Sequence, residues 1–249
     1  MTAFKAPRVA LFMVSLLAMA SQSAACQEAI RPSDSLKLEK FNNRYLERNW
    51  RTFEGRTEIK VSVYDGFLKI DRNQLGKRAA ALYDDAAAIF KSPLDELGWT
   101  RYLQDFPREV SEFYEVFCHD GPEGLTRRSL TFMLLIEDAV DDNPQCGIAI
   151  ILNLSRTEPV FGEDCEAGYR LRDIAAKFFC EQADLAFREL KKLRLSEQQE
   201  VFDFICSYEN KKAAVLDCIG NKLKEAKEPT LAKMFEQSLR RPYPVHKLD

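Results

Sequence analysis

The chain has 249 residues, of which 36 are Lys or Arg and 39 are Asp or Glu, so its formal net charge is −3. This length is sufficient for one sizeable hydrophobic core or two small ones. The mild acidity argues against a nucleic-acid-binding protein, which would show a basic excess, and gives no reason to expect anionic membranes as a partner.

Residues 1–25 have the three parts of a cleavable signal peptide. Lys5 and Arg8 form a positive head, residues 9–20 are apolar, and small or polar residues follow as far as Ala25. The apolar stretch is shorter than the ~20 residues that cross a bilayer, which favours removal after export over an N-terminal membrane anchor. Removal would take the formal net charge to −5, because the segment carries two basic residues and no acidic one.

Cys26 directly follows the expected cleavage site, which is where bacterial lipoproteins are acylated. Their signals normally place Leu three residues earlier, whereas this chain has Ser23 there, so we expect ordinary cleavage. No later segment approaches ~18 consecutive apolar residues, and we therefore expect no transmembrane segment in the mature protein. The predicted location is extracellular or periplasmic.

The first half of the mature chain is expected to combine helices with one small hairpin. Residues 36–53 carry apolar side chains at helical spacing. Between residues 58 and 70, β-branched residues alternate with polar ones around Asp65-Gly66, a pattern typical of a β-hairpin with a tight turn. An isolated hairpin would be marginally stable, so we expect it to lie against the helices.

The rest of the chain is expected to be helical. Ile148–Leu152 is an apolar run that fits either a buried strand or a helix. Ser196-x-x-Gln199 matches a capping box at the start of a helix. The ranges expected to form helices are 79–91, 93–103, 107–117, 123–140, 165–193 and 196–223.

These elements predict a mainly α fold, a disulfide-stapled helical domain with a possible small hairpin. We expect a break near residues 120–122, because Gly-Pro interrupts helices. The predicted regions are a signal peptide over 1–25, a helical region with the hairpin over 26–120, a disulfide-stapled helical region over 121–239 and an extended tail over 240–249.

Six cysteines follow Cys26, and an even number in an exported chain predicts three disulfides. None has the C-x-x-C spacing of a redox or zinc site. Cys165 and Cys180 would lie about 22 Å apart on one helix, too far to bond to each other. A helical hairpin near residue 195 instead predicts the pairs Cys118–Cys146, Cys165–Cys218 and Cys180–Cys206.

His119 and Asp120 are the catalytic candidates. Directly after Cys118, this pair resembles the His-Asp dyad of secreted calcium-dependent phospholipases, which implies a hydrolase. The chain departs from that family's pattern because the glycine-rich calcium loop and the second cysteine of the active-site motif are absent. The alternative interpretation is a surface pair at a helix end, where the helix dipole favours a histidine.

Three further motifs bear on ligands or modification. Asp71-x-Asn73 begins like a calcium-binding loop but lacks the later ligands of such a loop. It therefore predicts a turn at the start of a helix. We expect no metal or cofactor. Asn153-Leu154-Ser155 fits the N-glycosylation acceptor pattern. A cluster of carboxylates is expected to be a solvated helix end rather than a cation site; its members are Glu137, Asp138, Asp141 and Asp142.

The hypothesis that follows is an exported, non-enzymatic binding or interaction protein. Its partner would be a protein or a small hydrophobic ligand held in a cavity lined by some of the 17 phenylalanines; the simpler interpretation is that these residues fill the core. The alternatives are a secreted hydrolase that uses His119 with Asp120, and a periplasmic inhibitor or protective protein.

Overall fold

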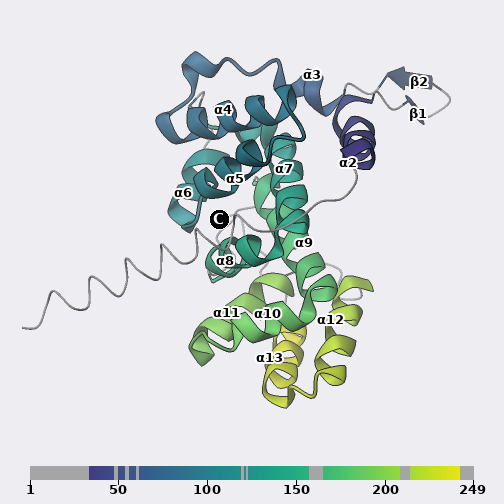
Figure 1. The fold of residues 1–249 in the computed structure, drawn as a ribbon. Coiled ribbons are helices and arrows are strands. Elements are labelled where there is room, and N and C mark those ends of the chain that lie inside the picture. Colours follow the sequence, from purple (N-terminus) through teal and green to yellow (C-terminus); the bar gives the residue numbers. More distant parts are fainter. Residues whose placement is uncertain are drawn as a thin grey trace, which may run out of the picture.

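The computed structural model describes residues 34–47, 50–53, 56–59, 62–118, 121, 123–156, 165–207 and 214–241. The described part is mainly helical, which confirms the predicted fold class (Figure 1). The elements up to residue 118 are α2 (Asp34–Phe41), the π-helix η1 (Asn42–Leu46), β1 (Trp50–Phe53), β2 (Arg56–Ile59), α3 (Val63–Phe67), the 3-10 helix η2 (Arg72–Gln74), α4 (Lys77–Lys91), α5 (Glu96–Asp105) and α6 (Val110–Phe117).

The elements after residue 120 are all helical. Their bounds are η3, a 3-10 helix (Thr126–Arg128), α7 (Ser129–Asp142), α8 (Pro144–Leu154), α9 (Glu166–Glu181), α10 (Ala183–Leu190), α11 (Leu195–Ile205), α12 (Ala214–Glu225) and α13 (Pro229–Arg240). The predicted signal peptide and Cys26 lie outside the described residues, as does the predicted tail after residue 241. Among the residues described, no helix is long and apolar enough to cross a membrane.

The helix predicted over 36–53 ends earlier than expected. Glu47 has an extended backbone with φ −70° and ψ 135°, and residues 50–53 form β1. This strand pairs antiparallel with β2, with Trp50 opposite Ile59. Aromatic residues and threonine favour strands, and in β1 they outweigh the helical spacing of the apolar residues.

The hairpin was predicted about ten residues too late in the chain. Asp65 and Gly66, the expected turn, lie inside α3. Ser62 explains this difference, because its side chain accepts a hydrogen bond from the backbone N–H of Asp65 at 3.0 Å while the Asp65 carboxylate accepts from the backbone N–H of Ser62 at 3.4 Å. This reciprocal capping box starts a helix where the sequence pattern favoured a strand.

Local capping also moves the starts of other helices. Asp95 caps α5 by accepting from the backbone N–H of Leu97 at 3.1 Å, so the helix begins after the predicted Ser92-Pro93 cap. Asn143 accepts from the backbone N–H of Cys146 at 3.3 Å, and Pro144 occupies the first turn of α8. The apolar run Ile148–Leu152 is therefore helical.

Later boundaries differ in the same way. The helix predicted over 165–193 is interrupted at Gln182, where φ is −114° and ψ is 38°. The helix expected over 123–140 begins only at Ser129, after the 3-10 turn of η3. The N-cap of α11 is Arg194 instead of Ser196, and its backbone N–H donates to Glu197 at 2.9 Å, where the sequence predicted Gln199 as the acceptor. The predicted capping box was therefore two residues out of register.

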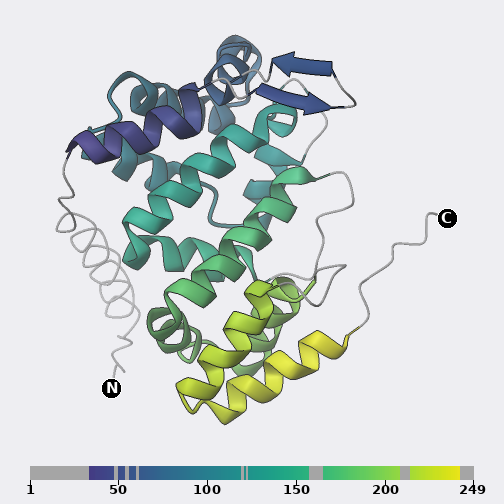
Figure 2. The same cartoon turned by 90° about the vertical axis from the view of Figure 1, so that its right-hand side faces the viewer.

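Helices α7 and α9 run through the middle of the molecule and pack against each other (Figures 1 and 2). Helices α2 to α6 lie at one end, where α3 and α5 pack on α7, and α10 to α13 lie at the other end. One continuous apolar core connects the two ends, from Phe41 to Phe235. Many phenylalanines pack against one another inside it, for example Phe113 on Phe117 with ring centroids 4.9 Å apart.

The disulfides differ from the predicted pairs. Cys118, at the end of α6, bonds to Cys165, the N-cap of α9, with α-carbons 5.0 Å apart. Cys180, in the last turn of α9, bonds to Cys218 of α12, with α-carbons 5.6 Å apart. Cys206 is a buried thiol rather than half of a disulfide.

The predicted pairs Cys118–Cys146, Cys165–Cys218 and Cys180–Cys206 were therefore wrong. They assumed that one long helix pairs with the next, but the chain breaks at Gln182 and α12, not α11, brings a cysteine against Cys180. Cys146 is disulfide-bonded as well, and the remaining cysteine, Cys26, lies outside the described residues. The prediction that Cys165 and Cys180 do not bond to each other was correct.

The contact between α7 and α8 allows no side chain at Gly147. A Cβ atom there would lie 2.7 Å from both methyl carbons of Val140, closer than any van der Waals contact. We expect Gly147→Ala to lower the free energy of unfolding by about 1–3 kcal/mol, because an overpacked core must move backbone or side chains. Urea denaturation of the full mature chain would measure it.

The matched control is Gly66→Ala in α3, where nothing lies within 4 Å of the added Cβ. This variant should be neutral or slightly stabilising, since Ala has the higher helix propensity. Equal stability of both variants would contradict the tight α7–α8 contact.

Candidate functional site

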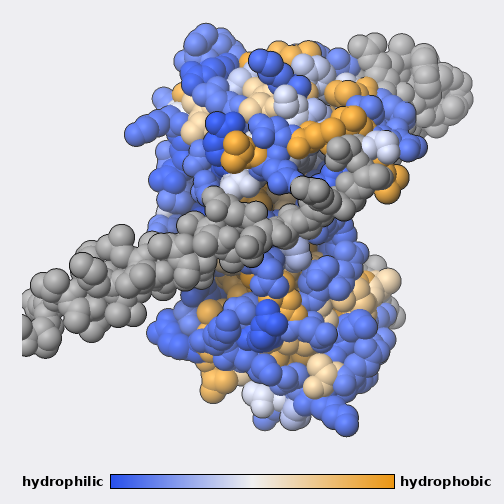
Figure 3. Space-filling view, viewed as in Figure 1, coloured by the Kyte–Doolittle hydropathy of each residue, from blue (hydrophilic) through white to orange (hydrophobic). Residues whose placement is uncertain are grey.

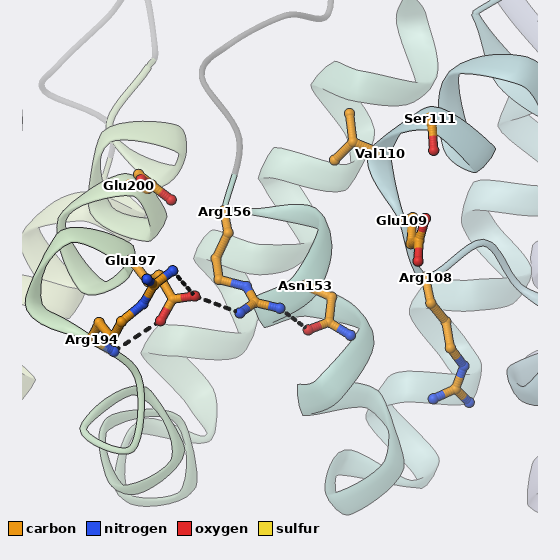
Figure 4. Close-up of a pocket in the computed structure, with 9 residues that line it drawn as sticks. All are labelled: Arg108, Glu109, Val110, Ser111, Asn153, Arg156, Arg194, Glu197 and Glu200. Carbon is orange, nitrogen blue, oxygen red and sulfur yellow. Dashed lines mark hydrogen bonds and ion pairs between the residues drawn. The ribbon is translucent and has the colours of Figure 1, made fainter.

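Three helix ends meet around an open cleft of about 560 Å³ (Figure 4). The N-terminus of α6, the C-terminus of α8 and the N-terminus of α11 each contribute polar side chains. In Figure 4, the residues of α11 lie on one side of the hollow, those of α6 on the other, and Arg156 and Asn153 lie between them. The lining residues are Arg108, Glu109, Val110, Ser111, Asn153, Arg156, Arg194, Glu197 and Glu200.

The local sequence explains why these side chains face the cleft. Helix α8 ends at Leu154 and Ser155 is its C-cap, so Arg156 is the first residue after the helix. Its side chain lies at the cleft because the helix does not continue past this point. Helices α6 and α11 begin with the same device, because in each the third helical residue is a glutamate that accepts from the N-cap backbone N–H. These caps fix Glu109 and Arg194 at the rim.

A row of charged and polar groups crosses from α11 to α8. Arg194 and Arg156 both bond to Oε1 of Glu197, at 3.2 and 3.0 Å, and Arg156 also donates to Oδ1 of Asn153. The hydrogen bond from Arg194, with the nearby charges of both arginines, lowers the pKa of Glu197 to about 2. Glu197 is therefore ionised at any pH at which the protein functions, and the row stays intact.

No protein-family model, curated protein or solved structure matches this chain.

The catalytic candidates lie outside the part of the chain that the structure describes. His119 and Asp120 follow Cys118 directly but have no described position, so the hydrolase hypothesis stays a prediction. Of the predicted modification and metal candidates, Asn153 lies in the last turn of α8 with its side chain bonded to Arg156. Asp71 caps η2 by accepting from the backbone N–H of Asn73 at 3.1 Å, which is the turn that the sequence predicted.

The predicted carboxylate cluster is a half-buried ion network instead of a solvated helix end. Glu137 and Asp138 of α7 both pair with Arg44 of η1, at 2.5 and 2.9 Å. Lys177 of α9 bonds to Glu137 at 3.1 Å and to Asp141 at 2.7 Å. The network thus connects η1, α7 and α9, and Asp142 is the exposed member of the predicted cluster.

Burial and charge act on the pKa values of this network in opposite directions. Burial raises the pKa of Asp138, against the influence of Arg44. For Glu137, burial also acts upward, but Arg44 and Lys177 together outweigh it and the pKa is lowered. Tyr45, whose hydroxyl donates to Asp138 at 2.7 Å, is fully buried and its pKa is raised well above 10. Because Tyr45 has no exposed surface and the ion pairs connect three packed elements, we interpret the network as structural.

The described part of the chain also offers no candidate metal site. Within the described ranges, no group of three or more His, Cys, Asp or Glu side chains is placed to hold a metal ion. A second hollow of about 450 Å³ between α7, α9 and α12 is lined by both apolar and charged side chains. Its apolar members are Met133, Leu134, Ile174 and Val215.

The sequence missed the three arginines of the cleft. Arg108, Arg156 and Arg194 are far apart in the chain, and each is adjacent to a helix end that sequence patterns place only to within a few residues. The glutamates at the third positions of α6 and α11 were the one local signal, since they mark the helix starts at Glu109 and Arg194.

We expect Asp85 to make the stability of the fold depend on pH. Asp85 is 8% exposed in α4, and burial, followed by the influence of the nearby Asp105 of α5, raises its pKa to about 7. With this raised pKa, the folded chain keeps a proton on Asp85 that the unfolded chain releases near pH 4. Stability should therefore fall as pH rises from about 4 to about 7 and change little above.

Asp85→Asn keeps a donor toward Asp105 and removes the titration. We expect the variant to be more stable than the parent at pH 8 by about 2–4 kcal/mol, and to lose less stability between pH 5 and pH 8. Urea denaturation at both pH values measures this difference. An identical pH dependence in parent and variant would show that Asp85 is not the titrating group.

Proposed function

We propose that this protein is an exported, non-enzymatic binding protein and that the cleft between α6, α8 and α11 contacts its partner. Two disulfides within the described residues suit an oxidising compartment outside the cytosol. The face in Figure 3 is predominantly hydrophilic, with apolar residues gathered in smaller groups. A polar cleft fits recognition through hydrogen bonds and charges better than through a large apolar contact.

One observation carries the proposal. Three helix ends bring Arg108, Arg156 and Arg194 to one cleft, and only part of their hydrogen-bonding capacity is used inside the protein. A guanidinium has five N–H donors in a fixed plane, and arginine is enriched where proteins recognise partners. The helices that carry these arginines are held by caps and core packing, so the cleft is formed before a partner arrives.

The other predicted functions gain no such support. A hydrophobic ligand would need an apolar cavity. The described phenylalanines pack against one another in the core, and the hollow between α7, α9 and α12 is lined by charged as well as apolar side chains. The hydrolase hypothesis depends on His119 and Asp120, outside the described ranges. An inhibitory or protective role would be a special case of partner binding at the same cleft.

Site-specific photo-crosslinking tests the proposal. A photoreactive amino acid at Ser111, which lines the cleft and is exposed, should cross-link a defined partner from the extracellular or periplasmic fraction of the native source. The same amino acid at Gln237, exposed on α13, is the matched control and should give no such product. Identical products from both positions, or none from Ser111, would refute the cleft as the binding site.

A further inference from the structure

We propose that the cleft binds a carboxylate of its partner between Asn153 and Arg108, within a peptide segment that also carries a cationic side chain. This inference rests on the proposed function and specifies the chemistry of the partner. It follows from which donors and acceptors around the hollow are already used inside the protein and which are not.

Asn153 faces the hollow with a donor. Arginine has only donors, so the atom of Asn153 that Arg156 contacts must be the side-chain oxygen. The amide nitrogen then points the other way, and Figure 4 shows it directed toward the side of the cleft where Arg108 lies. Two N–H groups are thus presented to the hollow, and only an acceptor can satisfy them.

Arg108 supplies the opposite wall. Its guanidinium makes one weak contact, from Nη2 to the backbone oxygen of Leu103 at 3.5 Å, and the residue is exposed at the rim. The remaining donors fit a carboxylate, which accepts two parallel hydrogen bonds from a guanidinium. A partner carboxylate that reached both Arg108 and Asn153 would have donors on two sides.

The acidic residues of the rim limit what can surround that carboxylate. The charge of Glu197 is already paired with Arg156 and Arg194, so Glu197 does not repel the partner carboxylate. Glu109 lies next to Arg108, and Glu200 lies at the α11 end of the cleft, so a polyacidic ligand would meet repulsion at both ends. A segment with an acidic residue beside a lysine or arginine satisfies both signs of charge.

The experiment is a titration of the isotope-labelled mature chain, followed by backbone NMR shifts, with blocked peptides. The probe is Ala-Lys-Glu-Ala, its matched control is Ala-Lys-Gln-Ala, and inorganic phosphate tests for an anion of another kind. We expect saturable shifts at Ser111 and Asn153 with the glutamate peptide, and at least tenfold weaker binding of the glutamine peptide and of phosphate.

Two variants locate the site. Asn153→Asp keeps the acceptor for Arg156 but replaces the inward amide donor by a carboxylate, so binding of the glutamate peptide should weaken at least tenfold. Arg108→Ala should weaken it similarly. Arg240→Ala is the control, because it removes a guanidinium whose side chain is 81% exposed on α13, and binding should not change.

Equal binding of the glutamate and glutamine peptides, preferential binding of phosphate, or unchanged binding by Asn153→Asp would each refute the carboxylate. These results are distinguishable from a failure of the proposed function. A partner that cross-links to Ser111 equally well in the Asn153→Asp variant would support the cleft as a binding site and refute the carboxylate contact alone.

Discussion

The disulfide bonds at the two ends of α9 are the constraint on which the rest of the structure depends. Cys165 connects the start of this helix to the end of α6, and Cys180 connects its last turn to α12. Closing loops of 47 and 38 residues by these bonds destabilises the unfolded chain by about 4 kcal/mol each in the chain-entropy account. Because α9 also packs on α7, both ends of the molecule are fixed relative to one central helix pair.

This arrangement positions the cleft. Helix α6 carries Cys118 at its end and the cleft residues at its start, so the first disulfide fixes the wall that contains Arg108. Helix α11 packs on α9 and provides the opposite wall. The bond between Arg156 and Glu197, at 3.0 Å, then connects the α11 wall to the end of α8, which lies between the two walls. The groups that we propose to contact a partner are therefore held by covalent bonds and helix packing, as preorganised recognition requires.

The sequence was sufficient for the helical class and for most helices, because apolar spacing over ten or more residues is a strong signal. It was insufficient where a single residue determines the local structure. The cap of Ser62 with Asp65 makes α3 helical, and the backbone conformation of Gln182 interrupts the long helix that was predicted. The disulfide pairs followed that second error. The cleft was not predictable, because Arg108 and Arg156 meet only through tertiary packing. The predicted division near residue 120 stays a prediction.

The most direct test of this account is peptide mapping of the mature protein under non-reducing conditions, with fragments identified by mass before and after reduction. The account predicts one fragment pair that joins Cys118 to Cys165 and another that joins Cys180 to Cys218. Recovery of a Cys118–Cys146 or a Cys165–Cys218 link in place of these would contradict it, because α9 would then not be fixed at both ends and the walls of the cleft would not be held together as described.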